Sequence, residues 1–273
     1  MDREEIIASA VKFTQDSPSN YVSGEKALDP LYVGMRMFEP PIFCYGSADD
    51  ELYTRYKSPD IIGDHFMTPK EWLPTAKTVV AFYIPYTERI RKANARDYEW
   101  PAEEWLHGRV EGQAFLNELS MYVQKLLSDA GYESLVPALD PRIKVGSATY
   151  KHTSNWSERH VAFACGLGTF GLSKGIITKK GMCGRLGSVI TEMDTLKDVR
   201  HYSDVYEYCS MCGACISHCP ARAISIEEGK KHQPCGEFLD KTREKEHPRY
   251  GCGKCQVGVP CEIKIPGGRG API

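Results

Sequence analysis

The feature that most constrains this chain is a run of closely spaced cysteines at residues 209–220, CSMCGACISHCP. Its spacing is C-x2-C-x2-C-x3-C-P, the pattern of bacterial ferredoxin-type cluster sites. Three cysteines at i, i+3 and i+6 converge on one cubane, whereas the fourth, just before Pro220, turns away to ligate another cluster. The run therefore predicts [4Fe–4S] clusters, the first of which needs one remote thiolate.

The remaining thiolates lie close by. Eight of the eleven cysteines fall in the last quarter of the chain, and Cys44, Cys165 and Cys183 are scattered upstream without ligand spacing. We expect two clusters with crossed ligation, one held by Cys209, Cys212, Cys215 and Cys261, the other by Cys219, Cys235, Cys252 and Cys255. An exchange of Cys235 and Cys261 between the sets is the main alternative. Two zinc sites are a second one, because C-x2-C pairs also bind zinc.

Composition excludes several other classes of protein. The 273 residues include 34 basic and 36 acidic side chains, so bulk charge indicates neither a nucleic-acid nor an anionic-membrane partner. The N-terminal MDREEIIASAVKF lacks the apolar core of a signal peptide, and no run approaches the roughly 18 apolar residues of a membrane span. We therefore expect a cytoplasmic protein without membrane contact, whose cysteines are ligands rather than disulfides.

The first two hundred residues have an α/β pattern. Residues 3–15 have helical spacing, and KTVVAFYIP (77–85) is typical of a buried, central strand. Apolar side chains then repeat at i, i+3 and i+4 over 109–130, and Gly131 supplies a helix stop. Because a short strand is expected at 132–139, this order predicts a βαβ crossover with parallel strands.

Further elements follow before the cysteines. Residues 154–171 predict a helix that ends at Gly166, with Asn155 and Glu158 spaced as a capping box. The glycines after it close a helix instead of joining a strand to a helix start, so they do not make a dinucleotide site. Two strands are expected at 175–181 and 185–193.

The polar residues 194–208 then predict a linker. We thus expect an α/β (α+β) domain over residues 1–200 and a ferredoxin-like double-cluster module over 201–273.

At this point the chain resembles a known family. The order of LPTAKTVVAFYIPY, a long helix, SERHVAFACGLGTFG, the first cysteine run and YGCGKCQ is similar to that of epoxyqueuosine reductases and, more distantly, of reductive dehalogenases. The resemblance covers roughly residues 70–262. It implies that electrons pass from two clusters to a cobalamin, which reduces a substrate.

The resemblance also implies where a corrinoid would lie, in residues 150–160, 166–171 and 182–187. From these we select candidate cofactor-binding residues: Ser154, Asn155, Trp156, Arg159, His160, Gly166, Gly168 and Phe170. Trp156 and Phe170 also fit an ordinary core, and Arg159 and His160 also fit a helix cap.

Reductive cleavage of a C–O or C–X bond needs an acid within hydrogen-bond reach. The proton donors nearest these positions are Tyr150, Lys151 and His152. His152 stands where the family has its catalytic aspartate, and the family's helical-repeat extension is absent from the sequence. We therefore expect poor reduction of a tRNA substrate.

Two functions remain open. The first is a cobalamin-dependent iron–sulfur reductase that receives electrons from a donor such as a ferredoxin or flavodoxin. The second is an electron-transfer protein or reductive activator that serves a partner protein. A scaffold of two hundred residues favours the enzyme, because a ferredoxin needs none.

Overall fold

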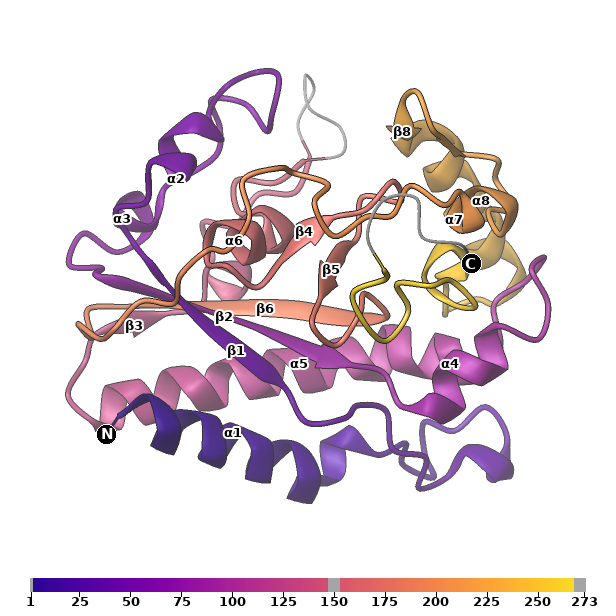
Figure 1. Ribbon diagram of the computed structural model, residues 1–273. Coiled ribbons are helices and arrows are strands. Elements are labelled where there is room, and N and C mark those ends of the chain that lie inside the picture. The colour runs from indigo at the N-terminus through magenta and orange to yellow at the C-terminus, as the bar shows by residue number, and fades with distance from the viewer. Residues whose placement is uncertain (1, 147–152, 268–273) are drawn as a thin grey trace.

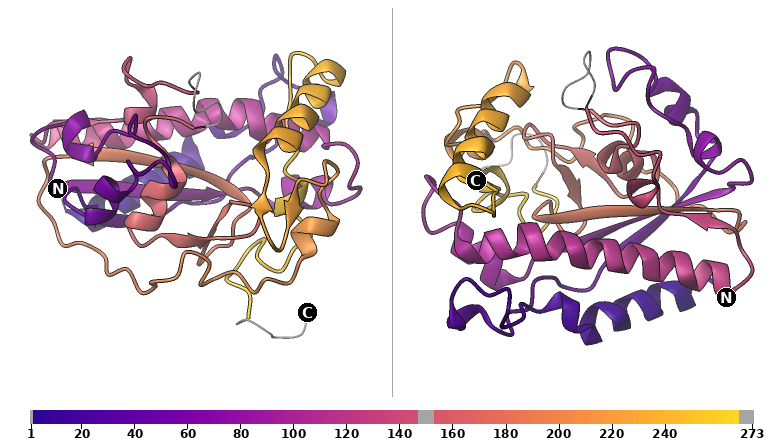
Figure 2. Two further views of the ribbon diagram at one scale, coloured as in Figure 1. Left: turned by 90° about the horizontal axis from the view of Figure 1, so that it is seen from above. Right: turned by 180° about the vertical axis from the view of Figure 1, so that it is seen from behind.

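The computed structural model describes residues 2–146 and 153–267. A four-stranded sheet separates two layers of helices, α1 and α5 on one face and α2, α3 and α6 on the other (Figure 1). The cysteine-rich segment with α7, α8 and the β7–β8 hairpin stands at one end of the sheet in every view (Figures 1 and 2). The predicted mixture of helix and sheet with a ferredoxin-like module is confirmed.

The bounds of the elements are as follows. The helices are α1 (Arg3–Asp16), α2 (Glu51–Arg55), α3 (Pro69–Trp72), α4 (Glu88–Asn94), α5 (Glu103–Asp129), α6 (Glu158–Ala164), α7 (Ala214–Ser217) and α8 (His232–Lys245). The strands are β1 (Ile42–Ser47), β2 (Thr78–Pro85), β3 (Ser134–Leu135), β4 (Gly168–Phe170), β5 (Ile176–Thr178), β6 (Gly184–Thr191), β7 (Ile224–Ser225) and β8 (Gly229–Lys230).

The strand order β1-β2-β6-β3 contains the predicted crossover, with one strand inserted into it. Every neighbouring pair is antiparallel, so β2 and β3 run in the same direction but β6 lies between them. The register shows why: β6 pairs with β2 along its whole length, from Thr78 opposite Thr191 to Pro85 opposite Gly184. The two residues of β3 pair only with the end of β6. A long partner from later in the chain thus occupies the place beside β2.

Strand β2 is the centre of the core, as its sequence predicts. Val80, Phe82 and Ile84 belong to the apolar cluster shared with α1 and α5. Val79 and Ala81, which alternate with them, belong to the cluster shared with α2, α3 and α6. The uninterrupted apolar run is therefore explained by burial of both faces of one strand.

Helix α5 begins six residues before the predicted start. Its first turn contains Glu103 and Glu104, whose negative charges are favourable at a helix N-terminus. Trp105 and Leu106 follow and are buried. The helix ends before Gly131, which has φ +88° as expected of a helix stop.

The predicted capping box at α6 is wrong. The N-cap is Ser157, which makes no side-chain cap bond. Asn155 instead accepts a hydrogen bond from Lys144 N–H (2.8 Å) and donates one to the Arg142 carbonyl (2.9 Å). The side chain of Glu158 is therefore not used as a cap and lines the site described below.

The strands expected at 175–181 and 185–193 both form, but they do not pair with each other. Strand β5 pairs with β4 in a small separate hairpin, and β6 joins the main sheet. Residues 192–208 contain neither helix nor strand. Within the described residues, no helix combines the length and apolar character needed to cross a membrane.

Candidate cofactor-binding site

A cavity of about 1000 Å³ opens between the sheet domain and the cysteine-rich module. Helices α5 and α6, strand β6, the β4–β5 hairpin and the residues after α2 form its domain side. The module contributes the region around Pro220, Lys230 and the segment 251–256. A cavity of this size accommodates a large ligand rather than a substrate of a few atoms.

Buried polar atoms without hydrogen-bond partners collect around this cavity. They are Tyr83 Oη, Trp105 Nε1, Arg185 Nε and both carboxylate oxygens of Glu158. Because buried polar groups are nearly always paired in a protein, such a group of orphans indicates that a ligand supplies the missing partners. Both donors and acceptors are present, so a ligand rich in amide groups, as a corrinoid is, fits this lining.

Glu158 is the most perturbed acid of the cavity. Burial raises the pKa of its carboxyl to about 7, and the nearby Ser188 hydroxyl and Trp156 indole oppose the shift. Those two groups bond to each other, since Trp156 Nε1 donates to Ser188 Oγ at 3.0 Å. Glu158 can therefore hold a proton near neutral pH, as general acids do.

The neighbouring His160 has the opposite shift. Burial, and next the charge of Arg159, lower the pKa of its imidazole to about 4. Its Nδ1 lies 2.8 Å from Ser157 Oγ. The imidazole is thus neutral at physiological pH and acts there as a hydrogen-bonding group.

The cysteines of the module fall into two groups of interacting thiols. Burial, and next the thiolates of Cys209, Cys215 and Cys212, raise the pKa of Cys261 to about 12. For Cys252 the causes are again burial first, followed by Cys255, Cys235 and Cys219, and its pKa is also about 12. Cys255 also acts on Cys215, so the two groups are adjacent.

Only one group faces the cavity. Cys219, Cys235, Cys252 and Cys255 line it. Of the other group, Cys212 is exposed at the molecular surface. The two groups of cysteines thus extend from the molecular surface to the wall of the cavity.

Two buried charged side chains of the module, Arg249 and Lys254, hold it against the domain. Arg249 donates to Glu111 of α5 at 2.7 Å, and His107 Nδ1 lies 3.0 Å from the same carboxylate. Although burial would raise it, the hydrogen bonds from His107 and Arg249 lower the pKa of Glu111 to about 2. Lys254 is wholly buried, and its Nζ donates to the carbonyls of Asn94 and Asp97, both at 2.8 Å.

The glycine of the CGKC sequence is explained by the same docking. Gly253 has φ +65°, and a Cβ there would lie 1.8 Å from Trp105 Cζ2. Only glycine permits both the backbone conformation and the close approach. The loop between Cys252 and Cys255 is therefore shaped by α5, at the wall of the cavity.

The candidate residues from the sequence divide into three sets. Ser154, Trp156, Arg159, His160 and Phe170 line the cavity. Asn155, Gly166 and Gly168 are not among its lining residues. Gly166 has φ +89° at the end of α6, and a Cβ on Gly168 would lie 2.1 Å from the Ile177 carbonyl oxygen, so both have backbone roles. The proposed proton donors Tyr150, Lys151 and His152 lie outside the described residues.

The sequence reasoning missed several cavity residues. Trp105 lies upstream of the predicted helix start, and Glu158 was assigned to a helix cap. Tyr83 and Arg185 belong to predicted strands in which nothing marks a polar side chain as functional. Lys174 could have been found from the sequence, because a lysine inside a glycine-bounded turn is unusual.

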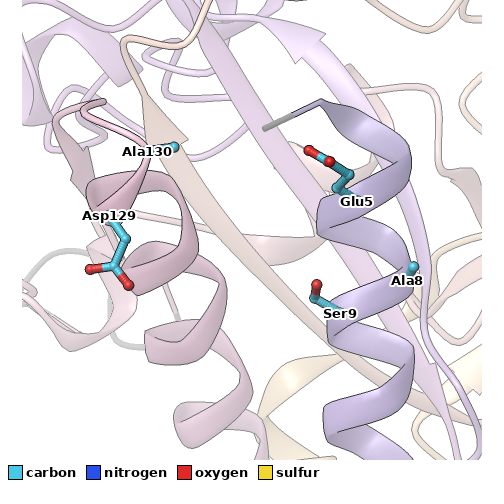
Figure 3. Close-up of a pocket in the computed structure, with 5 residues that line it drawn as sticks. All are labelled: Glu5, Ala8, Ser9, Asp129 and Ala130. Carbon is cyan, nitrogen blue, oxygen red and sulfur yellow. The ribbon is translucent and has the colours of Figure 1, made fainter.

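A second hollow lies far from this chemistry. It opens between the first turns of α1 and the last turn of α5, where Glu5, Ser9 and Asp129 stand on facing helices (Figure 3). Its other lining residues are Ala8 and Ala130. It contains no cysteine and no buried cation, so we assign it no function.

Comparisons with known proteins agree with this picture. The 4Fe-4S binding domain family matches residues 202–225. The epoxyqueuosine reductase of Lactococcus garvieae is 25% identical over 214 residues, which are 72% of this chain and 55% of that protein. The chain thus spans about half the length of this curated relative. The resemblance drawn from the sequence is confirmed.

Solved structures show the same fold. A crystal structure of selenomethionine-labelled epoxyqueuosine reductase aligns with 95% of this chain and 65% of its own, at a TM-score of 0.54 and 22% identity. A reductive dehalogenase structure, described as suggesting a mechanism for B12-dependent dehalogenation, aligns with 96% of this chain and 37% of its own. Its TM-score is 0.51 and its identity 14%.

Proposed function

We propose that this protein is an iron–sulfur oxidoreductase in which two [4Fe–4S] clusters deliver electrons to a cobalamin in the cavity. The observation that carries the proposal is the position of Cys219, Cys235, Cys252 and Cys255 on the wall of a cavity that also gathers orphaned polar atoms. When bound there, the corrinoid supplies a cobalt centre that passes electrons to the substrate.

The cysteine sets are proposed as the cluster ligands. Cys209, Cys212, Cys215 and Cys261 would hold the cluster nearer the surface, and Cys219, Cys235, Cys252 and Cys255 the cluster beside the cavity. The mutual pKa effects within each set support this division over an exchange of Cys235 and Cys261. The exposed position of Cys212 supports electron entry there from a donor such as a ferredoxin or flavodoxin.

The domain residues are proposed to bind and orient the corrinoid. Trp156 and Phe170 offer flat apolar contacts, and Ser154, Arg159 and His160 offer polar ones. The proton for the reaction is assigned to His152, Tyr150 or Lys151. Two electrons and two protons convert an epoxide to an alkene and water; two electrons and one proton convert a C–X bond to C–H and halide.

The substrate class follows from the same residues. Because His152 occupies the position of the family's aspartate, we propose that small epoxides or organohalides are reduced better than epoxyqueuosine in tRNA. Single turnover of chemically reduced protein with each substrate class measures this. Efficient tRNA turnover that His152→Ala leaves unchanged would overturn both the substrate preference and the assignment of the acid.

The central experiment is anaerobic purification with added cobalamin, followed by iron, sulfide and absorbance measurements. We expect about eight irons and eight sulfides per chain, and a spectral change of cobalamin on binding. Cys219→Ser should remove the cavity-side cluster, whereas Cys44→Ser, outside both sets, should change neither quantity. Zinc without sulfide would refute the clusters. Clusters without cobalamin binding would favour an electron carrier that serves a partner protein.

A further inference from the structure

Three cations line the cavity, two from its domain side and one from the module. Arg159 comes from α6, Lys174 from the β4–β5 turn and Lys230 from β8. Among the hydrogen bonds and ion pairs of the described residues, none involves any of these three side-chain head groups. Burial first, and then the charges of Lys230 and Arg159, lower the pKa of the Lys174 amine. The three positive charges thus repel one another, and no carboxylate pairs with them among the described residues.

The backbone at Lys174 adds an independent observation. Lys174 has φ +57°, in the left-handed region that glycine and asparagine tolerate best. Its N–H donates to the Gly171 carbonyl at 2.8 Å, and Gly171 N–H donates to that of Gly175 at 2.9 Å, which closes the turn. A lysine here is strained, because its Cβ crowds the backbone in this region. The backbone conformation at this position disfavours lysine. We infer that the side chain of Lys174 has a functional role.

Two of the three cations also lie near cysteines of the module. Arg159 interacts with the Cys255 and Cys235 thiols, and Lys230 with that of Cys255. A cluster bound by four thiolates carries net negative charge, which these two cations would offset. No cysteine acts on Lys174. The acidic residues lining the described cavity are Asp60 and Glu158, and neither forms an ion pair with it. Lys174 is therefore left for a ligand.

We propose that Lys174, with Arg159 and Lys230, forms an anion-binding site that receives a phosphate or carboxylate group of the molecule occupying the cavity. This deepens the proposed function and rests on it for the identity of that molecule. The anionic group has two possible sources, the phosphodiester of cobalamin itself and a charged group on the substrate. In either case it supplies the counter-charge that Lys174 does not find within the described residues of the protein.

The first measurement is calorimetric titration of inorganic phosphate into cluster-replete, cobalamin-free protein at constant ionic strength. Lys174→Asn removes the charge but keeps a residue that tolerates the left-handed backbone. Lys231→Asn is the matched control, because Lys231 is exposed and paired with Glu228 at 2.6 Å. We expect Lys174→Asn to weaken phosphate binding by about tenfold and Lys231→Asn to leave it unchanged. Equal phosphate affinity in all three proteins, or none in the wild type, overturns the proposal.

The second measurement identifies the source of the anion by comparing cobalamin with cobinamide, which lacks the phosphodiester and nucleotide. If the anion is that of the cofactor, the wild type prefers cobalamin and Lys174→Asn loses most of the preference. If the anion is that of the substrate, the preference is unchanged, and cobalamin-loaded protein still binds phosphate in a Lys174-dependent way. Failure of the wild type to bind either corrinoid refutes the proposed function alone, and the phosphate titration still decides the anion site.

Discussion

The sheet domain and the cluster module are held together by different forces. Around β2, large apolar side chains such as Phe82, Tyr83 and Ile84 are almost completely buried on both faces of the sheet. In the module, the 14-residue α8 buries only Thr242. Of the five buried residues in the apolar cluster of this region, three come from the sheet domain, namely Leu172, Ile177 and Met182. The domain is therefore stable through packing, whereas the module depends on its metal and on a few ionic contacts.

Cluster removal should have the largest effect and should affect the two regions differently. Because the module has almost no apolar core of its own, loss of iron should unfold most of residues 209–261 while the sheet persists. Hydrogen exchange of iron-free and iron-replete protein measures this, with β2 amides as the internal control. Equal protection of the module in both forms would contradict the comparison.

A substitution in the core of the sheet domain should destabilise the domain and leave the clusters of the module in place. Phe82→Ala removes a fully buried ring of β2 and should lower the free energy of unfolding of the domain by about 4 kcal/mol. Denaturant titration followed by far-UV circular dichroism measures the change. Met121→Ala, at a half-exposed position on α5, is the control and should cost less than about 0.5 kcal/mol. Iron content at low temperature should remain at the wild-type value.

Glu111→Gln tests the ionic contact between the regions. It leaves Arg249 buried without its counter-charge and should weaken docking of the module by about 3 kcal/mol. The expected readout is faster iron release to a chelator at neutral pH. Asp129→Asn breaks an exposed pair with Lys125 on the same helix and should have no effect. In the wild type, acid should mimic the substitution as pH falls from about 4.5 toward 2, because the folded-state pKa of Glu111 is lowered.

Glu158 should produce the smallest effect, with the opposite dependence on pH. Its folded-state pKa of about 7 exceeds the ordinary 4.5, so the folded domain binds the proton more tightly than the unfolded chain. The free energy of unfolding should therefore fall by about 2.5 kcal/mol as pH rises from 4.5 to 7. Glu158→Gln should abolish this dependence. A slope that is identical in the two proteins would show that another group is responsible.

The features that could be predicted from the sequence differ between the sheet domain and the module. Apolar periodicity located α1, β2 and most of α5, because burial of side chains determines those elements. The spacing of Cys209 to Cys219 located the module, because cluster geometry requires it. Both signals are local, and each can be recognised within a short window of residues.

The spatial arrangement of elements that are far apart in the sequence could not be predicted from such local patterns. The insertion of β6 between β2 and β3 depends on pairing across about one hundred residues, and no local pattern specifies it. Likewise, Tyr83, Trp105 and Arg185 reach one cavity from three separate elements. These side chains can be identified as candidate ligand contacts only from the structure, in which their polar atoms are buried without hydrogen-bond partners.

The proximity of Cys261 to Cys209 also has a consequence for biosynthesis. The proposed surface-side cluster takes its ligands from the first and the last cysteine of the module, and the cavity-side cluster needs Cys255. During translation, the early cysteines emerge from the ribosome long before either site has its fourth ligand. Iron and sulfide delivered at that stage would find only incomplete sites. Cluster insertion is therefore expected to follow synthesis of the whole cysteine-rich segment, onto a sheet domain that has already folded.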